Sequence, residues 1–365
     1  MKRIQAIPEK MHALVLHAPH DLRYEEVQVP QINEDEILVR VKSCGICAGD
    51  LKAVHGAAMF WGGGVLPKWI DEPVILGPEV VGEVVAIGDA AAKRTGLELG
   101  DLSIAEQIIP CGECYFCKRG YTWMCEKQNI YGAKKNESDG GMAEYMKYPK
   151  NAVVHKVPAS IPAWQAAMIE PASCAAHTIE RADIGINDVV VIAGLGPIGL
   201  CKLQFAKMRT PKTLIAIDLN NKRLELARKL GADYTFNPKE MDVIQAVKDL
   251  TGGYGCDIYI HDSGSPAGVR QGLQMLRKLG KFVEFSVFAD ETSVDWSIIG
   301  DRKELTILGS HISGHDGYEV AIRSIADGSL KVDDIVTHRY GLEAFEEAYR
   351  TAEAAVDSIK IVFEP

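Results

Sequence analysis

The pattern of hydrophobic and polar positions changes character near Pro162, and this change divides the chain into two parts. From Ala13 to about Val157, short apolar segments rich in β-branched residues, such as 37–41 and 80–87, are separated by Gly and Pro. After Pro162, apolar stretches of strand length alternate with segments of helical periodicity. The pattern predicts an irregular β-rich module followed by an α/β module with a parallel sheet.

The second part is expected to form a doubly wound sheet with crossover helices. The expected strands are residues 189–193, 213–218, 257–262 and 281–286. The expected helices are residues 164–181, 198–208, 222–230, 241–250 and 268–279. A further helix at 342–353 and a strand at 359–363 close the chain, and their pattern alone does not assign them to either part.

A glycine-rich turn follows the apolar strand 189–193 and opens a helix. The residues that match the dinucleotide fingerprint G-x-G-x-x-G are Gly194, Gly196, Pro197, Ile198 and Gly199. Such glycines permit a tight turn, a close approach of backbone to a pyrophosphate, and packing of the helix on the strand. The phosphates would face the helix N-terminus. The alternative interpretation is a glycine-rich turn that binds no nucleotide.

An acidic residue ends the next expected strand and bears on the choice of cofactor. Asp218 stands where an acid accepts a hydrogen bond from the ribose 2′-hydroxyl, which favours NAD over NADP. Arg223 follows a few residues later and weakens this preference, because arginine accommodates a 2′-phosphate. The sequence therefore predicts an NAD site.

Four of the nine cysteines lie close together in the β-rich part. They follow the spacing C-x-x-C-x-x-C with a fourth cysteine after seven residues, and they are Cys111, Cys114, Cys117 and Cys125. Four thiolates on a short loop complete the tetrahedral coordination of zinc and leave no open position for a substrate. The spacing predicts a structural zinc site, with buried free thiols or disulfides as the alternative.

Composition and charge exclude several other classes of protein. The chain of 365 residues is 47% hydrophobic and 25% charged, which is typical of a folded globular protein large enough for two domains. A formal net charge of −10 argues against nucleic-acid or anionic-membrane partners, which need clustered Lys and Arg. No membrane span or signal peptide is expected, so the predicted location is the cytoplasm.

Taken together, these motifs resemble the zinc-dependent medium-chain dehydrogenases, and within them the branch of sorbitol and erythritol or threitol dehydrogenases. The resemblance covers nearly the whole chain. It rests on Cys44-Gly-Ile-Cys47-Ala-Gly-Asp50, on Leu76-Gly77-Pro78-Glu79 with the segment to Gly88, on the four-cysteine loop, on Glu170-Pro171 and on the nucleotide fingerprint. It implies a GroES-like catalytic domain at 1–165 and 317–365 and a Rossmann domain at 166–316.

The resemblance also implies a catalytic zinc, held here by Cys47, Glu79 and Glu170, beside Asp50. The metal would lower the pKa of a substrate hydroxyl while hydride passes to the nicotinamide. Two positions depart from the family pattern. Pro78 stands where the family has a zinc-binding histidine, and a prolyl nitrogen cannot ligate a metal. The family's hydroxyl relay position is Gly49, so His55 is expected to serve as base, relay or compensating ligand, or to be an ordinary loop histidine.

By family position, five further residues are expected to line the nicotinamide end of the cleft: Phe285, Ser286, Val287, Ser310 and His311. The predicted substrate is a short polyol or its ketose, and a homo-oligomer, either dimer or tetramer, is implied by resemblance. Because of Pro78, two other functions stay open: a reductase without catalytic zinc, or a nucleotide-binding protein without catalytic activity.

Overall fold

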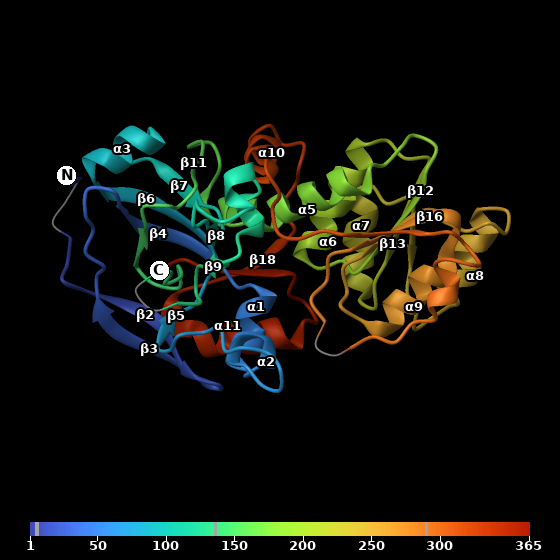
Figure 1. Cartoon of the computed structure of the whole chain (residues 1–365), viewed down its shortest axis with the longest axis horizontal. Coiled ribbons are helices and arrows are strands. Elements are labelled where there is room, and N and C mark those ends of the chain that lie inside the picture. The colour runs from blue at the N-terminus through green and yellow to red at the C-terminus, as the bar shows by residue number, and fades with distance from the viewer. Residues whose placement is uncertain (4–6, 135–136, 289–290) are drawn as a thin grey trace. The chain divides into compact units, whose positions relative to one another are not determined.

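The computed structural model describes residues 1–3, 7–134, 137–288 and 291–365, and the chain divides into two compact units (Figure 1). The β-rich unit comprises Met1–Glu170 and Tyr318–Pro365, and the parallel-sheet unit comprises Pro171–Gly317. Among the described residues, no helix has the length and apolar character needed to cross a bilayer.

The β-rich unit is built on a mixed sheet in the order β11-β7-β6-β4-β19-β18, with β1 on β6 and β10 on β4. Its strands are β1 (Lys2–Arg3), β2 (Lys10–Ala18), β3 (Asp21–Gln28), β4 (Ile37–Gly45), β5 (Val74–Ile75), β6 (Glu79–Ile87), β7 (Leu102–Ala105), β8 (Ile108–Ile109), β9 (Asn129–Ile130), β10 (Tyr145–Tyr148), β11 (Val154–Lys156), β18 (Val336–Tyr340) and β19 (Lys360–Phe363). β2 pairs with β3 and β5 in a second sheet, and β8 pairs with β9.

Short helices connect these strands. They are α1 (Ala48–Val54), α2 (Ala58–Trp61), α3 (Asp89–Thr95), α4 (Ala163–Ala166), α10 (Gly317–Ala326), α11 (Phe345–Ala354) and the 3-10 helices η1 (Cys117–Arg119), η2 (Thr122–Met124) and η4 (Leu342–Ala344). The C-terminal strand β19 pairs antiparallel with β4, so the last residues complete the sheet of the β-rich unit. Buried apolar side chains from β4, β6, β10 and β19, including Val39, Val84, Met146 and Phe363, form its core.

The second unit is a parallel sheet in the order β14-β13-β12-β15-β16-β17. Its strands are β12 (Val189–Ala193), β13 (Thr213–Ile217), β14 (Tyr234–Phe236), β15 (Cys256–His261), β16 (Leu276–Glu284) and β17 (Thr306–Gly309). Its helices are α5 (Ile169–Ala182), which begins in the β-rich unit, α6 (Pro197–Met208), α7 (Asn221–Lys229), α8 (Val243–Leu250), α9 (Pro266–Met275) and η3 (Trp296–Ile298).

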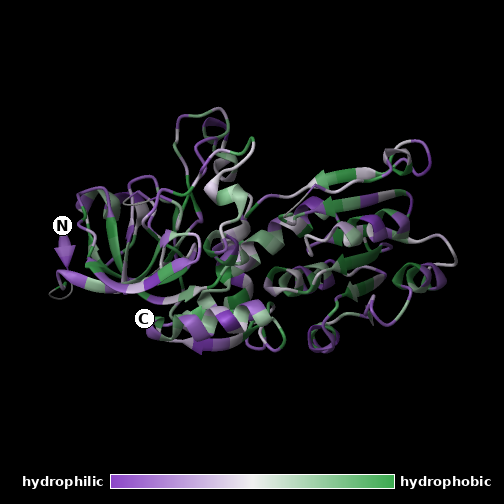
Figure 2. Cartoon of the chain, turned by 90° about the horizontal axis from the view of Figure 1, so that it is seen from below, coloured by the Kyte–Doolittle hydropathy of each residue, from purple (hydrophilic) through white to green (hydrophobic). Residues whose placement is uncertain are grey.

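The strand order reverses between β12 and β15, which are adjacent although the chain leaves β12 toward β13. All five residues of β12 are buried, and the strands of this sheet are largely green, or hydrophobic, in Figure 2. A strand buried on both faces reads as a continuous apolar run, as 189–193 does. The predicted fold class, a GroES-like β-rich module joined to a doubly wound Rossmann sheet, is confirmed.

Two expected helices differ from those observed. The helix expected at 164–181 is two helices, α4 and α5, because Pro171 has no N–H for the carbonyl four residues earlier and is tolerated only in a first turn. The helix expected at 268–279 ends at Met275, where the chain becomes extended and begins β16. Leu279 within this strand has φ 62°, a conformation that a continuing helix excludes.

Candidate functional site

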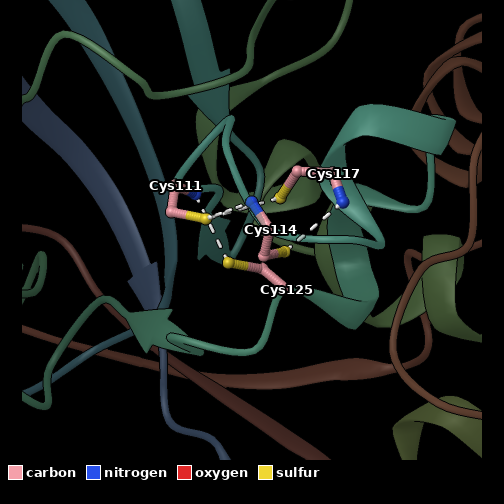
Figure 3. Close-up of side chains that lie close together, drawn as sticks. All are labelled: Cys111, Cys114, Cys117 and Cys125. Atoms are coloured by element: carbon pink, nitrogen blue, oxygen red, sulfur yellow. Dashed lines mark hydrogen bonds between the residues drawn. The ribbon is translucent and has the colours of Figure 1, made fainter.

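The four clustered cysteines lie on the segment between β8 and β9 and point toward one another (Figure 3). Their sulfur atoms all lie within 4.8 Å of one another. Gly112, at φ 75°, allows a tight turn between Cys111 and Cys114, and Gly120, at φ 82°, allows one between Cys117 and Cys125. Within the described ranges, no other group of three or more His, Cys, Asp or Glu side chains has its possible ligand atoms within 4.8 Å of one another.

Backbone amides point at these sulfur atoms. The amide of Cys114 donates to Sγ of Cys111 at 3.3 Å, and the amide of Cys111 donates to Sγ of Cys125 at 3.3 Å. The amide of Cys117 donates to Sγ of Cys114 at 3.4 Å and, with other backbone donors, lowers the pKa of the Cys114 thiol to about 6. Such donors stabilise thiolates, and four thiolates fit tetrahedral zinc without an open position.

The glycine-rich fingerprint lies at the carboxyl end of β12 and at the start of α6. Gly194 has φ 103°, and a Cβ there would lie 2.7 Å from the carbonyl carbon of Asp262, which follows β15. A Cβ on Gly199 would lie 2.0 Å from the carbonyl oxygen of Gly194. Gly196, by contrast, has no neighbouring atom within 4 Å of a Cβ, so its backbone is open to a ligand. Pro197 occupies the first turn of α6 and is followed by Ile198.

The carboxylate of Asp218 is turned toward this fingerprint. Its Oδ2 accepts a hydrogen bond of 2.7 Å from the amide of Leu195, and its Oδ1 accepts one of 2.8 Å from the amide of Asn220. Asp218 directly follows β13, which is the neighbour of β12. Arg223 lies in the first turn of α7, where its amide donates to Oδ1 of Asn220. The structure therefore brings Asp218 to the fingerprint turn.

The remaining expected cofactor residues follow the ends of the neighbouring strands. Phe285, Ser286 and Val287 come directly after β16, and Ser310 and His311 come directly after β17. The hydroxyl of Ser310 lies 3.1 Å from that of Thr178 on α5, within the same unit. Burial lowers the pKa of His311. Ligands of open α/β sheets bind at the carboxyl ends of the strands, where all five residues lie.

Cys47 and Asp50 are joined at the start of α1. Cys47 is the N-cap residue, and its Sγ accepts a hydrogen bond of 3.4 Å from the amide of Gly49. Its amide donates to Oδ2 of Asp50 at 2.8 Å, which completes a capping box. Burial raises the pKa of Asp50 to about 7. Burial and the charge of Glu79 raise the pKa of the Cys47 thiol.

Glu79 begins β6 and forms a buried ion pair with Lys360 of β19. Both side chains are 3% exposed, and the Lys360 ammonium also donates a hydrogen bond of 2.9 Å to the carbonyl of Ile46. Burial lowers the pKa of Lys360, but the net shift is upward, and the charge of Glu79 is the largest of the opposing causes. The sequence analysis did not identify Lys360. The only feature that could have indicated its role is a charged residue at the start of the apolar strand β19.

Glu170 lies in the first turn of α5 and is buried, and its charge adds to the causes that raise the pKa of Cys47. Among the described residues, Cys47, Glu79 and Glu170 do not form a group with ligand atoms within 4.8 Å of one another. Pro78 supplies no donor, and Lys360 already neutralises Glu79. In this geometry the donors do not fit a closed three-ligand metal site.

His55 is the C-cap residue of α1, and its side chain is 49% exposed. Its Nε2 lies 2.8 Å from Oε1 of Glu353 on α11, and its ring is tilted against that of His20. A Cβ on Gly49 would lie 3.6 Å from Sγ of Cys47. The structure thus brings Asp50 to Cys47 but pairs His55 with Glu353.

Comparison with known proteins identifies the class to which this fold and these motifs belong. Residues 33–159 match the alcohol dehydrogenase GroES-like domain, and residues 197–327 match the zinc-binding dehydrogenase domain. An erythritol/L-threitol dehydrogenase from Mycolicibacterium smegmatis is 49% identical over 98% of this chain and 99% of its own. An L-threonine 3-dehydrogenase from Pyrococcus abyssi is 35% identical over 97% of this chain and 99% of its own.

A solved structure supports the same class. The 2R,3R-butanediol dehydrogenase from Bacillus subtilis is 25% identical, with a TM-score of 0.85 over 97% of this chain and 99% of its own. The chain therefore belongs to the zinc-binding dehydrogenase family, and the family that its motifs indicate is confirmed.

Proposed function

We propose that the chain is an NAD-dependent dehydrogenase that oxidises a secondary hydroxyl of a short polyol to a ketone. The observation that carries this proposal is the 49% identity to an erythritol/L-threitol dehydrogenase over nearly the full length of both chains. The relative named for L-threonine is less similar, at 35%. In the reaction a hydride passes to the nicotinamide, and the hydroxyl proton is released.

NAD is the proposed cofactor, and Asp218 is the residue that selects it. Its carboxylate already lies against the fingerprint turn through the amide of Leu195. An acid there binds the ribose 2′-hydroxyl and repels a 2′-phosphate. We expect kcat/KM for NAD to exceed that for NADP by at least about tenfold, and we expect Asp218→Ser to reduce this ratio. An unchanged ratio would remove Asp218 from the choice of cofactor.

Zinc is proposed at two sites, and the structure supports one of them more strongly than the other. The four-cysteine loop is the proposed structural site, because its sulfur atoms already converge. A second zinc at Cys47, Glu79 and Glu170 requires Glu79 to leave Lys360 for the metal. A metal there would supply Lewis acidity toward the substrate oxygen.

Pro78 and the Glu79–Lys360 pair favour a second candidate function. If Lys360 keeps Glu79, the chain holds only the structural zinc and acts as a reductase without catalytic metal, or as a nucleotide-binding protein. The two candidates differ in metal content, since the first predicts two zinc ions per chain and the second predicts one.

The deciding experiment combines zinc content by mass spectrometry with NAD reduction on erythritol, threitol, sorbitol and L-threonine. Both are measured for wild type, for Pro78→His and for Pro67→His, which places the same substitution at an exposed proline. Two zinc ions and polyol-dependent NADH formation in the wild type support the first candidate. One zinc and no turnover, both reversed by Pro78→His alone, support the second. Turnover on L-threonine but on no polyol would contradict the proposed substrate.

The proposal extends to a homo-oligomer, dimer or tetramer, in the cytoplasm, with no nucleic-acid or membrane partner. Light scattering behind size exclusion gives the oligomeric state, and a mass of one chain would contradict it.

A further inference from the structure

A buried lysine lies one helical turn after the nucleotide fingerprint. Lys202 is on α6, four residues after Ile198, so the two side chains share one face of the helix. Its side chain is 0% exposed, and the residues before and after it in α6, from Pro197 to Ala206, are uncharged. A buried ammonium is costly unless it is paired, so its position requires an explanation.

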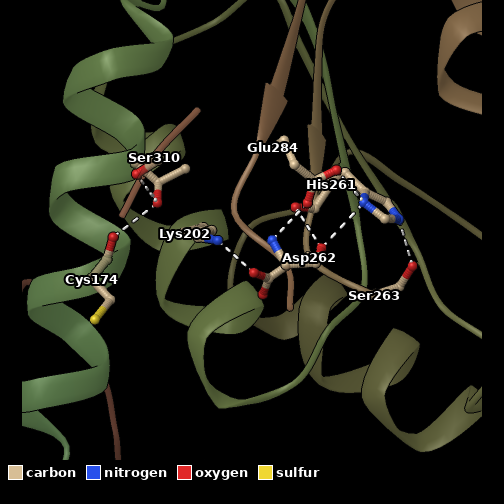
Figure 4. Close-up of polar contacts among 9 residues, drawn as sticks. Cys174, Lys202, His261, Asp262, Ser263, Glu284 and Ser310 are labelled. Carbon is tan, nitrogen blue, oxygen red and sulfur yellow. Dashed lines mark hydrogen bonds and ion pairs between the residues drawn. The ribbon is translucent and has the colours of Figure 1, made fainter. Parts of the chain in front are cut away.

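The partner of Lys202 is Asp262, the first residue after β15 (Figure 4). Nζ of Lys202 lies 2.5 Å from Oδ1 of Asp262, whose side chain is 7% exposed. The ammonium also lies 3.7 Å from the centre of the Phe285 ring. Burial lowers the pKa of Lys202 and raises that of Asp262, and the ion pair opposes both shifts.

Asp262 touches the fingerprint itself. Its amide donates to the carbonyl of Ala193 at 2.8 Å, and its backbone leaves no room for a Cβ on Gly194. Its Oδ2 would lie 3.1 Å from a Cβ on Gly199. The carboxylate therefore lies at the turn between β12 and α6, beside the switch point of the sheet, where a dinucleotide pyrophosphate is expected to bind.

An unneutralised carboxylate at this turn would repel the pyrophosphate of a dinucleotide. We propose that Lys202 is a positioning residue of the dinucleotide site, which neutralises Asp262 and thereby keeps the fingerprint turn receptive to a dianionic pyrophosphate. This inference rests on the NAD site proposed above. Among the described residues, ionisable groups that act on the pair include Cys174 on α5, His261 on β15 and Glu284 on β16. Nδ1 of His261 lies 2.8 Å from Oε2 of Glu284.

The test compares variants with opposite effects on charge. Binding of NADH, ADP-ribose and adenosine is measured by calorimetry at pH 8.5. Lys202→Met removes the ammonium and leaves the Asp262 carboxylate without its partner. Asp262→Asn removes the carboxylate and leaves the Lys202 ammonium without its partner. The double variant Lys202→Met with Asp262→Leu removes both charges, and Lys202→Arg keeps the cation. Melting temperatures are recorded in parallel, because either single variant breaks a buried pair.

We expect Lys202→Met to raise the Kd of NADH and ADP-ribose about tenfold, which is about 1.4 kcal/mol. Adenosine, which carries no phosphate, should bind within about twofold of wild type. Asp262→Asn should bind NADH at least as tightly as wild type, and the double variant and Lys202→Arg should return to within about threefold. If Lys202→Met does not fold, the double variant and Asp262→Asn still decide the question.

A purely structural ion pair predicts a different pattern. Both single variants would then weaken all three ligands together and in proportion to the loss of melting temperature. That pattern, or unchanged NADH binding in Lys202→Met, overturns the inference while leaving the NAD site intact. Failure of the wild type to bind NADH would instead overturn the proposed function.

Discussion

The buried ion pair between Glu79 and Lys360 should contribute strongly to the stability of the β-rich unit, and removing one partner tests this. Lys360→Met removes the ammonium with little change in volume and leaves Glu79, 3% exposed, with an uncompensated charge. Removing one partner of a buried pair costs about 3–5 kcal/mol. The carbonyl of Ile46 also loses its 2.9 Å hydrogen bond, and an unmade bond of this kind costs about 1–3 kcal/mol.

These two costs are not additive, because Glu79 can protonate and the structure can admit water. We therefore expect a loss of about 4 kcal/mol in the free energy of unfolding. In a unit of about 200 residues this lowers the melting temperature by roughly 10 °C. Urea unfolding followed by circular dichroism, with differential scanning calorimetry, measures both quantities.

The controls separate the pair from a general effect of losing a lysine. Lys156→Met removes an exposed lysine paired with Asp101, and it should change stability by less than about 1 kcal/mol. The double variant Lys360→Met with Glu79→Gln removes both charges and should recover part of the loss. A Lys360→Met protein as stable as Lys156→Met would contradict this expectation, because the buried charge of Glu79 would then cost nothing. Added zinc that restores its stability would show that a metal replaces the ammonium at Glu79.

Single substitutions test the zinc loop, the fingerprint glycines and an ion pair of the β-rich unit. Cys125→Ser should lower the zinc content by about one ion per chain, and an unchanged content by mass spectrometry would remove zinc from the four-cysteine loop. Gly194→Ala should weaken NADH binding and lower the melting temperature, because the residue has φ 103° and the added Cβ would have no room. At Gly196 an added Cβ has room within the protein, so Gly196→Ala should weaken NADH binding with the melting temperature unchanged. Glu83→Gln should lose about 1 kcal/mol at pH 7, because Arg40, at 2.7 Å, lowers the pKa of Glu83. A lowered carboxyl pKa adds stability that is fully present above the ordinary carboxyl pKa and is lost as the pH falls through the lowered pKa of the folded protein. The difference in stability between wild type and variant should therefore vanish in acid, and a difference that persists at pH 2 would contradict this.

Local sequence patterns were sufficient to predict a β-rich module followed by a parallel α/β module, and to predict the motifs that lie on continuous stretches of chain. The family resemblance added that the β-rich module is GroES-like. The apolar run 189–193, the fingerprint from Gly194 and the spacing of the four cysteines each contain most of their structure in one short segment. The partners of Glu79 and Asp262 could not be found in this way. Lys360 reaches Glu79 because β19 pairs with β4, and Lys202 reaches Asp262 from a different element, so both pairs depend on tertiary packing.

Proline in place of histidine at position 78 removes a possible metal ligand but leaves the backbone of the fold compatible with either residue. Pro78 is buried between β5 and β6, one residue before the β6 ladder begins, so no sheet hydrogen bond depends on its missing N–H. Gly77 before it has φ 102°, and a Cβ there would lie 2.6 Å from Sγ of Cys44, which fixes this turn independently of the residue that follows. The strand register from Glu79 onward is therefore compatible with either proline or histidine. Where wild type and Pro78→His have the same melting temperature, a difference in zinc content or turnover between them then reports on the ligand and not on refolding of the site.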